Sequence, residues 1–133
     1  MEISTGRFAL DFPEVLLRSI RDLGAIVHPG YPWWLSPLLR RGVLAITLGR
    51  RIYLSGEAVS LLRAGSTEIL RHELVHVEQA RRLGLIRFLV RYLFEYVRNR
   101  LRRLPPAAAY AAISFEVEAA MAERRAAGKE KTL

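Results

Sequence analysis

The chain has 133 residues, of which 51% are hydrophobic and 26% charged, and it carries a formal net charge of +8. This length is typical of one domain with its own core, so we expect a single domain over residues 1–133 with flexible ends at 1–12 and 129–133. The sequence contains no cysteine, which excludes disulfides and thiolate ligands. A metal ion would have to be held by histidine and carboxylate side chains.

The first residues, MEISTGRFALDF, lack the basic start and long apolar core of a signal peptide. No uncharged apolar stretch reaches the roughly 18 residues of a membrane-spanning helix. We therefore predict no transmembrane helix and a cytoplasmic location. No recognised nucleic-acid-binding motif accompanies the positive charge, so we expect no specific nucleic-acid partner.

The first predicted element is a helix over residues 13–23, with Pro13 in its first turn and Gly24 at its end. Apolar residues recur along it every three or four positions, which places them on one face. That face consists of Val15, Leu16, Ile20 and Leu23. We expect it to pack against the core of the domain.

Residues 28–37, HPGYPWWLSP, predict a loop, because they contain three prolines and one glycine. Trp33 and Trp34 are expected to fold over the core, whereas exposed tryptophans would indicate the rim of a binding site. His28 is a weak candidate metal ligand, since a histidine beside Pro-Gly in a loop is usually solvated.

Residues 43–55, VLAITLGRRIYLS, predict a β-hairpin in which two strand-forming runs flank a turn at Gly49 and Arg50. The hairpin could simply cover the helix that follows it. Its edge could also pair with the backbone of an extended peptide. The sequence is compatible with both uses.

The next helix is expected over residues 65–83, and it contains the motif HELVH. His72 and His76 lie four residues apart, on one helix face, where two imidazoles can bind one metal ion. Glu73 lies at the edge of that face and could take a proton from a zinc-activated water, whose pKa is about 7. This is the HExxH pattern of metallopeptidases, although a buried helix with two satisfied histidines would give the same residues.

Residues 85–104, LIRFLVRYLFEYVRNRLRRL, predict a long helix whose apolar side packs on the core while its arginines face water. The apolar side consists of Leu85, Phe88, Leu89, Tyr92, Leu93, Tyr96 and Val97. A basic amphipathic helix could instead rest on an anionic membrane or on phosphate groups.

Two prolines interrupt the chain at 105–106, and a last helix is predicted over residues 107–127, ending at Gly128. It contains Glu116 and Glu118 among small and apolar residues. Carboxylates in such a setting are costly unless they are paired or bind a metal.

A catalytic zinc ion usually has three protein ligands and a water molecule. No histidine follows His76 in the sequence, so the third ligand is expected to be a carboxylate from a later helix. Both Glu116 and Glu118 fit this position. Because residues two apart on a helix point to different sides, at most one of them should face the metal.

Three segments carry a family resemblance: AITLGRRIYL at 45–54, LRHELVHVEQ at 70–79 and AYAAISFEVEA at 109–119. They resemble the small bacterial HExxH peptidase-like domains of the gluzincin branch, which include a domain found near extracellular contractile injection systems. In that family the segments form a strand with a glycine turn, the metal-binding helix and a Phe-Glu-x-Glu-Ala element. Ser114 stands where these domains often have proline.

The resemblance implies a metal site with the ligands His72, His76 and Glu116, with Glu118 as the fallback for the third position. It also implies that Glu73 is the general base. Tyr110 could stabilise the oxyanion beside the metal, or it could be an ordinary aromatic residue of the core.

We therefore predict an α+β, zincin-like fold, in which a small antiparallel sheet or hairpin packs on the metal-binding helix and further helices lie behind. The predicted function is that of a Zn²⁺-dependent metalloendopeptidase acting on peptide or protein substrates. Two alternatives are a catalytically inactive scaffold of the same fold and a basic module that binds anionic membrane or nucleic acid.

Overall fold

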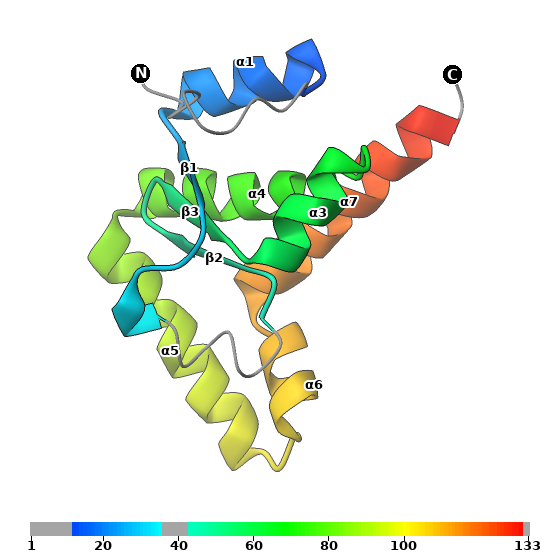
Figure 1. Cartoon of the computed structure of the whole chain (residues 1–133). Helices are drawn as coiled ribbons and strands as arrows, with labels where there is room; N and C mark the ends of the chain where they lie inside the picture. Colours follow the sequence, from blue (N-terminus) through cyan, green and yellow to red (C-terminus); the bar gives the residue numbers. More distant parts are fainter. Residues whose placement is uncertain (1–11, 36–42, 132–133) are drawn as a thin grey trace.

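Figure 1 shows the computed structural model of the chain, which describes residues 12–35 and 43–131. Within these two ranges the chain forms six α-helices, one 3-10 helix and three strands. In chain order they are α1 (Glu14–Leu23), β1 (Ile26–Pro29), η1 (Trp33–Leu35), β2 (Ala45–Leu48), β3 (Arg51–Leu54), α3 (Gly56–Arg63), α4 (Glu68–Leu83), α5 (Leu85–Leu101), α6 (Pro106–Ala111) and α7 (Ser114–Lys131). The mixture of helices with one small sheet confirms the predicted α+β class.

Helix α4 lies at the centre of the structure and contacts α1, α5, α7 and the sheet (Figure 1). It buries Leu70, Leu74 and Val77 in a core shared with α1, the strands and α3. These residues recur every three or four positions, so they form a row along one side of the helix. On its other sides α4 buries the polar residues Glu73, His76 and Gln79.

The boundaries of α4 differ from the prediction at its start, which lies at Glu68 and not at residue 65. The preceding helix, α3, was not predicted. The hydroxyl of Ser55 caps α3 by accepting a hydrogen bond from the backbone N–H of Ala58 at 3.1 Å. At the other end of α4, Gly84 has a φ of +92°, which lets the chain turn directly into α5.

The sheet has the strand order β1-β3-β2. β2 and β3 form the predicted antiparallel hairpin, with Gly49 in the turn at a φ of +63°. β1 pairs in parallel with β3, so the sheet is mixed and the prediction of an antiparallel sheet is wrong in this respect. Strand formation fits the β-branched residues Ile26 and Val27, and Val27 is buried beside Ile52.

The predicted first helix is present as α1, which follows Pro13 and ends at Gly24. Leu16 and Ile20 are buried as expected. Val15 is exposed, because it lies next to Leu16 in sequence and therefore points to another side of the helix. The buried side of α1 is narrower than predicted.

The prediction that Trp33 and Trp34 cover the core is wrong, since their relative exposures are 84% and 51%. Both lie in η1, beyond the end of β1. Trp34 packs edge-on against Tyr53, whose neighbours in β3 are buried on the opposite face of the sheet. The tryptophans therefore lie outside the core that joins the sheet to α4.

The helix predicted over residues 85–104 is present as α5, but its predicted apolar side is only partly buried: Phe88 lies in a core cluster, and Tyr92 and Tyr96 pack against it. Phe88 is the one apolar residue of α5 that is buried, alongside two polar residues. The exposed members of the predicted core side are Leu85, Leu89, Leu93 and Val97. Figure 1 shows α5 extending away from the sheet, and among the described elements its main contacts are with α4, α6 and α7.

The last predicted helix consists of two helices, because the chain leaves the helical path between α6 and α7, next to the buried Ile113. α7 continues through Gly128 to Lys131, so the predicted end at Gly128 is wrong. A glycine inside a helix costs about 1 kcal/mol relative to alanine but does not stop it. None of the described helices is long and apolar enough to cross a membrane.

Candidate metal centre

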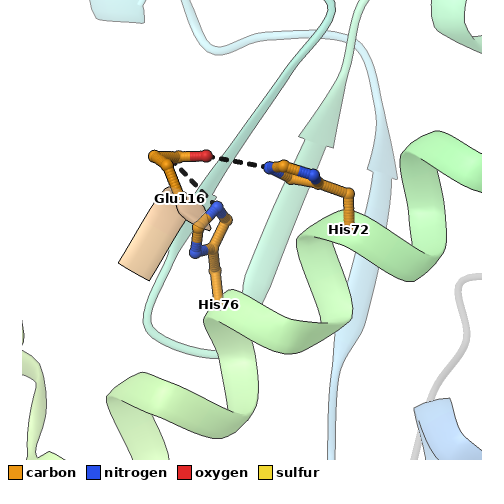
Figure 2. Close-up of side chains that lie close together, drawn as sticks. All are labelled: His72, His76 and Glu116. Carbon is orange, nitrogen blue, oxygen red and sulfur yellow. Dashed lines mark hydrogen bonds and ion pairs between the residues drawn. The ribbon is translucent and has the colours of Figure 1, made fainter. Parts of the chain in front are cut away.

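Three side chains from two helices meet at one point (Figure 2). His72 and His76 lie one turn apart on α4, and Glu116 lies in the first turn of α7. One ligand atom from each residue belongs to a set whose members all lie within 4.8 Å of one another. Nε2 of His72 is 2.9 Å from Oε2 of Glu116, and Nε2 of His76 is 3.1 Å from Oε1 of Glu116. This arrangement is compatible with a metal site.

The position of Glu116 depends on how α7 begins. The backbone N–H of Ser114 donates to Oε1 of Glu95 at 3.2 Å, and the Ser114 hydroxyl donates to Oε2 at 2.8 Å. Glu95 is a buried residue of α5, so its carboxylate holds the first residue of α7 against that helix. A proline at position 114, as in the domains that the sequence resembles, would have no N–H to donate.

Gln79 fixes the tautomer of His76. The amide nitrogen of Gln79 donates to the carbonyl oxygen of Phe115 at 3.1 Å, so its Oε1 faces Nδ1 of His76 at 2.9 Å. Because an amide oxygen only accepts hydrogen bonds, Nδ1 of His76 carries the proton and Nε2 is left with its lone pair. In metal sites generally, a residue that accepts a hydrogen bond from the non-ligating ring nitrogen of a histidine fixes its tautomer and orientation in this way.

Nε2 of His76 is buried and has no hydrogen-bond partner among the described residues, because Oε1 of Glu116 lies close to it but not in a suitable direction. A nitrogen lone pair and a carboxylate oxygen repel each other unless a positive charge lies between them. Burial lowers the pKa of His76, but Glu116 and Glu73 together raise it above its ordinary value, so a proton and a metal cation would compete for this lone pair. A metal cation would satisfy both atoms at once.

His72 has a carboxylate at each ring nitrogen, since Nε2 faces Glu116 and Nδ1 lies 3.1 Å from Oε2 of Glu123. The hydrogen bond to Glu116 is the main reason why the pKa of His72 is raised to about 9, against the effect of burial. Burial would raise the pKa of Glu116, but the hydrogen bond from His72 and the nearby His76 imidazole hold it well below its ordinary value. The negative charge of Glu116 therefore favours a positive charge among the three side chains, which protons or a metal cation can supply.

Tyr92 of α5 supports the same carboxylate, because its hydroxyl donates to Oε1 of Glu116 at 2.8 Å. Burial is the main cause that raises the pKa of Tyr92, so the phenol keeps its proton. The hydrogen bond holds Oε1 in place and leaves Oε2 to His72. The sequence placed Tyr92 only among the apolar residues of its helix.

Glu73 lies one residue after His72 and is buried. Its Oε2 accepts a hydrogen bond of 2.6 Å from the hydroxyl of Thr47 in β2. Burial is the main cause that raises the pKa of Glu73 above its ordinary value, although the Thr47 hydroxyl and the two histidines oppose this. A carboxylate whose pKa is raised towards neutrality is suited to general base catalysis.

One cavity of about 640 Å³ adjoins this cluster, and its polar lining includes Glu73, His76 and Glu116. Residues of α5 and α6 form apolar walls. All four residues of β2 line the cavity, as expected when an edge of a strand borders it and not one face. Within the described residues β2 pairs only with β3, so this edge has free backbone groups.

The other three predicted site residues, Glu118, Tyr110 and His28, lie outside the cluster of three candidate ligands. Glu118 points away from the cluster and lies 3.5 Å from Arg82, with more than half of its side chain exposed. Tyr110 lines the cavity and lies edge-on to Tyr92, with ring centroids 6.5 Å apart. His28 belongs to β1, where it stacks on Tyr53, and it is not part of the metal-ligand cluster.

Four supporting residues were not predicted from the sequence: Thr47, Gln79, Tyr92 and Glu123. Helical spacing could have indicated two of them. Gln79 lies three residues after His76, and Glu123 lies seven residues, or about two turns, after Glu116. Thr47 and Tyr92 come from other elements, and no local pattern links them to the motif.

A family model described as the eCIS core domain matches residues 39–84, which links the chain to the cores of extracellular contractile injection systems. The matched segment includes β2, β3, α3 and α4, and with them His72, Glu73 and His76. Glu116 lies outside it, so this match does not bear on the third candidate ligand. No curated protein and no solved structure matches the chain.

Proposed function

We propose that the chain is a zinc-dependent metallopeptidase of the gluzincin type, with a zincin-like arrangement of β2 beside α4. One observation carries the proposal. The buried lone pair of His76 Nε2 faces an ionised oxygen of Glu116 at 3.1 Å, and His72 completes a three-membered donor set. Two imidazoles and one carboxylate are a donor set that suits zinc, and three protein ligands leave room for catalysis.

A zinc ion in this position would supply Lewis-acid polarisation of a carbonyl group and would make water more acidic. The remaining steps belong to the chain. Glu73 accepts the proton of the attacking water, since its carboxylate is buried beside the site and its pKa is raised. After attack on the peptide carbonyl, the protonated Glu73 gives this proton to the leaving amine.

The cavity supplies the means to hold an extended peptide. The free edge of β2 can add the peptide backbone as a further strand, and the apolar walls from α5 and α6 can take its side chains. Tyr110 lines the same cavity, and burial is the main cause that raises its pKa. A protonated phenol can donate a hydrogen bond to the oxyanion that forms during attack.

The first test is metal content by mass spectrometry on untagged protein purified without added metal. We expect about one zinc per chain in the wild type and in Glu118→Ala, and none in Glu116→Ala. Glu118 is a matched control, because it lies on the same helix but is paired with Arg82 outside the cluster. Wild-type protein that stays metal-free after incubation with zinc would overturn the proposed metal site.

The second test separates metal binding from catalysis. Glu73→Gln should keep its zinc but hydrolyse an unfolded protein substrate at least about 100-fold more slowly, which is the usual contribution of a general base. Glu78→Gln, an exposed change on the same helix, should leave the rate unchanged. Zinc-loaded wild type that cleaves no unfolded substrate would favour the inactive scaffold.

A further inference from the structure

The outer side of α5 carries a continuous row of exposed apolar side chains, which we call the α5 stripe. Its members are Ile86, Val90, Phe94, Val97 and Leu101. They recur every three or four residues over the whole helix, so they lie on one side of it. Ile86 and Phe94 are 77% and 63% exposed.

The α5 stripe is distinct from the side of α5 that packs inside the protein. The buried residues of this helix are Phe88, Glu95 and Asn99, which follow the same spacing on the opposite side. Phe88 packs on Phe115, Glu95 binds Ser114, and Asn99 donates to the carbonyl of Ala109. Among residues 12–35 and 43–131, these contacts hold α5 in the fold through the side opposite the α5 stripe. A contiguous exposed apolar row of this kind is typical of a binding surface.

Positive charge borders the α5 stripe. By helical spacing, Arg87, Arg91 and Arg98 lie along one border of it and Arg100 lies along the other. Arg102 and Arg103 follow at the end of the helix and are exposed.

Negative charge is nearly absent from this surface. Glu95 is the one acidic residue between positions 85 and 104, and its side chain is only 9% exposed. Arg91 and Arg98 lie near it, at 3.5 and 3.8 Å. Arg87 has no ion pair among the described residues, so its charge is available to an anionic partner.

We propose that the α5 stripe docks the protein onto an anionic lipid membrane, with α5 lying flat in the interface. An apolar row with arginines along its borders is the pattern of interfacial helices, because the apolar side chains enter the acyl region while the charges reach the phosphates. Each arginine near such a surface adds favourable attraction to anionic lipids.

The charge pattern disfavours two other occupants. In a dimer formed through the α5 stripe, the arginine borders of both copies would come together with no exposed acidic residue on either helix to pair with them. A nucleic acid would use the arginines, but it would leave the apolar side chains in water. An anionic membrane is the partner that uses both features of the surface.

The test is co-sedimentation of the full chain with lipid vesicles. We expect binding to phosphatidylcholine vesicles that contain about one quarter phosphatidylglycerol, and much weaker binding to pure phosphatidylcholine. The double change Ile86→Ser with Phe94→Ser should weaken binding to the anionic vesicles about tenfold or more. The double change Arg87→Gln with Arg100→Gln should weaken it by about tenfold and reduce its dependence on salt.

A matched control places equivalent changes elsewhere. Val15→Ser with Arg63→Gln alters one exposed apolar and one exposed basic residue on α1 and α3, and it should leave vesicle binding unchanged. All variants are compared by melting temperature, since the exposed positions should change stability little. The assay contains no peptide substrate, so its result does not depend on the proposed peptidase activity.

Three results would overturn the proposal. Equal binding of the wild type and the Ile86→Ser, Phe94→Ser variant would show that the α5 stripe does not enter the membrane. A wild-type dimer in sedimentation equilibrium that this variant disrupts, without any vesicle binding, would assign the surface to a second copy of the chain. A fall in melting temperature as large as that of a core substitution would show that the chain itself covers the α5 stripe.

Discussion

Helices α4 and α5 follow each other directly, with only Gly84 between them, yet they depart from the usual burial pattern in opposite ways. α4 buries the polar side chains of Glu73, His76 and Gln79. α5 buries one apolar side chain and leaves a row of others exposed. Buried polar groups and exposed apolar rows are both unfavourable in a monomer without partners.

The two departures indicate two different kinds of partner. On α4 the buried polar atoms satisfy one another except at Nε2 of His76, so the unfilled need is for a cation. On α5 the two buried polar residues find partners, Glu95 with Ser114 and Asn99 with Ala109, and the row of exposed apolar side chains is what lacks a partner among the described residues. The comparison therefore supports the proposal of a metal site on α4 and the separate proposal of a docking surface on α5.

The largest expected effect tests whether the buried side of α4 contributes more to the stability of the fold than the exposed side of α5 does. Leu70→Ala should lower the free energy of unfolding by about 2–5 kcal/mol, since Leu70 is fully buried and its loss leaves a cavity. Ile86→Ala should change it by less than about 0.5 kcal/mol, because Ile86 is exposed. Urea denaturation of the purified chain measures both.

Equal losses from Leu70→Ala and Ile86→Ala would break the comparison. That result would mean that the α5 stripe is packed inside the protein in solution, and the docking proposal would fall with it. A large loss from Leu70→Ala alone would leave the α5 stripe as a surface that contributes nothing to folding.

The second effect concerns the protons that a metal must displace on α4. Metal binding requires neutral His72, whose pKa is about 9 in the metal-free protein. Metal affinity should therefore fall about tenfold per pH unit as the pH drops from about 9 to 7. Competition with a chelator of known affinity, repeated at several pH values, measures this slope.

The stability of the metal-free protein should change in the opposite direction. The pKa of His72 is raised on folding from 6.5 to about 9, so its contribution to stability is fully present below pH 6.5 and is lost as the pH rises through 9. The increase in melting temperature caused by zinc should consequently grow over this range. An affinity that does not vary with pH would show that the metal does not bind at His72.

The third effect concerns the residue that orients His76. Gln79→Leu leaves Nδ1 of His76 without its acceptor, so metal affinity should fall by about 10- to 100-fold, as for other outer-shell partners. Glu78→Leu changes the exposed neighbour and should leave the affinity unaltered. If both variants bind metal equally well, the tautomer of His76 is not fixed by Gln79 and the argument from its lone pair fails.

Much of the fold could be predicted from local patterns. The hairpin and α4 followed from strand-forming runs around Gly49 and from helical spacing in ILRHELVHVEQ. β1 was missed because it has four residues, ends in Pro29 and forms only by pairing with β3, which lies far along the chain. The exposure of α5 was missed because apolar residues occupy two of its sides, and the sequence does not say which side the other helices cover.

In the candidate site, too, local patterns predict some residues, whereas others are positioned by contacts between distant elements. His72 and His76 follow from spacing within one helix, and Glu116 followed from the need for a third ligand together with the family resemblance. The hydrogen bonds that orient these groups join α4 to β2, α5 and α7. Such contacts depend on tertiary packing, which no local pattern in the sequence encodes.

The smallest effect tests whether the sheet edge tunes the proposed base. The hydroxyl of Thr47 donates to Oε2 of Glu73 and thereby favours the ionised carboxylate. Thr47→Val keeps the shape of the side chain but removes the donor, so the pKa of Glu73 should rise further. One net hydrogen bond is worth about 1 kcal/mol, so kcat/KM at neutral pH should fall by about three- to tenfold.

The pH profile distinguishes this role from a structural one. Because Glu73 must be ionised to act as a base, the acidic limb of kcat/KM should move to higher pH in Thr47→Val, with the loss becoming smaller as the pH rises. Thr47→Ser retains the hydroxyl and should restore the wild-type profile. A loss of equal size at every pH would instead mean that Thr47 positions β2 against α4. The substitution would then have altered the strand edge that we propose holds the substrate, and not the pKa of Glu73.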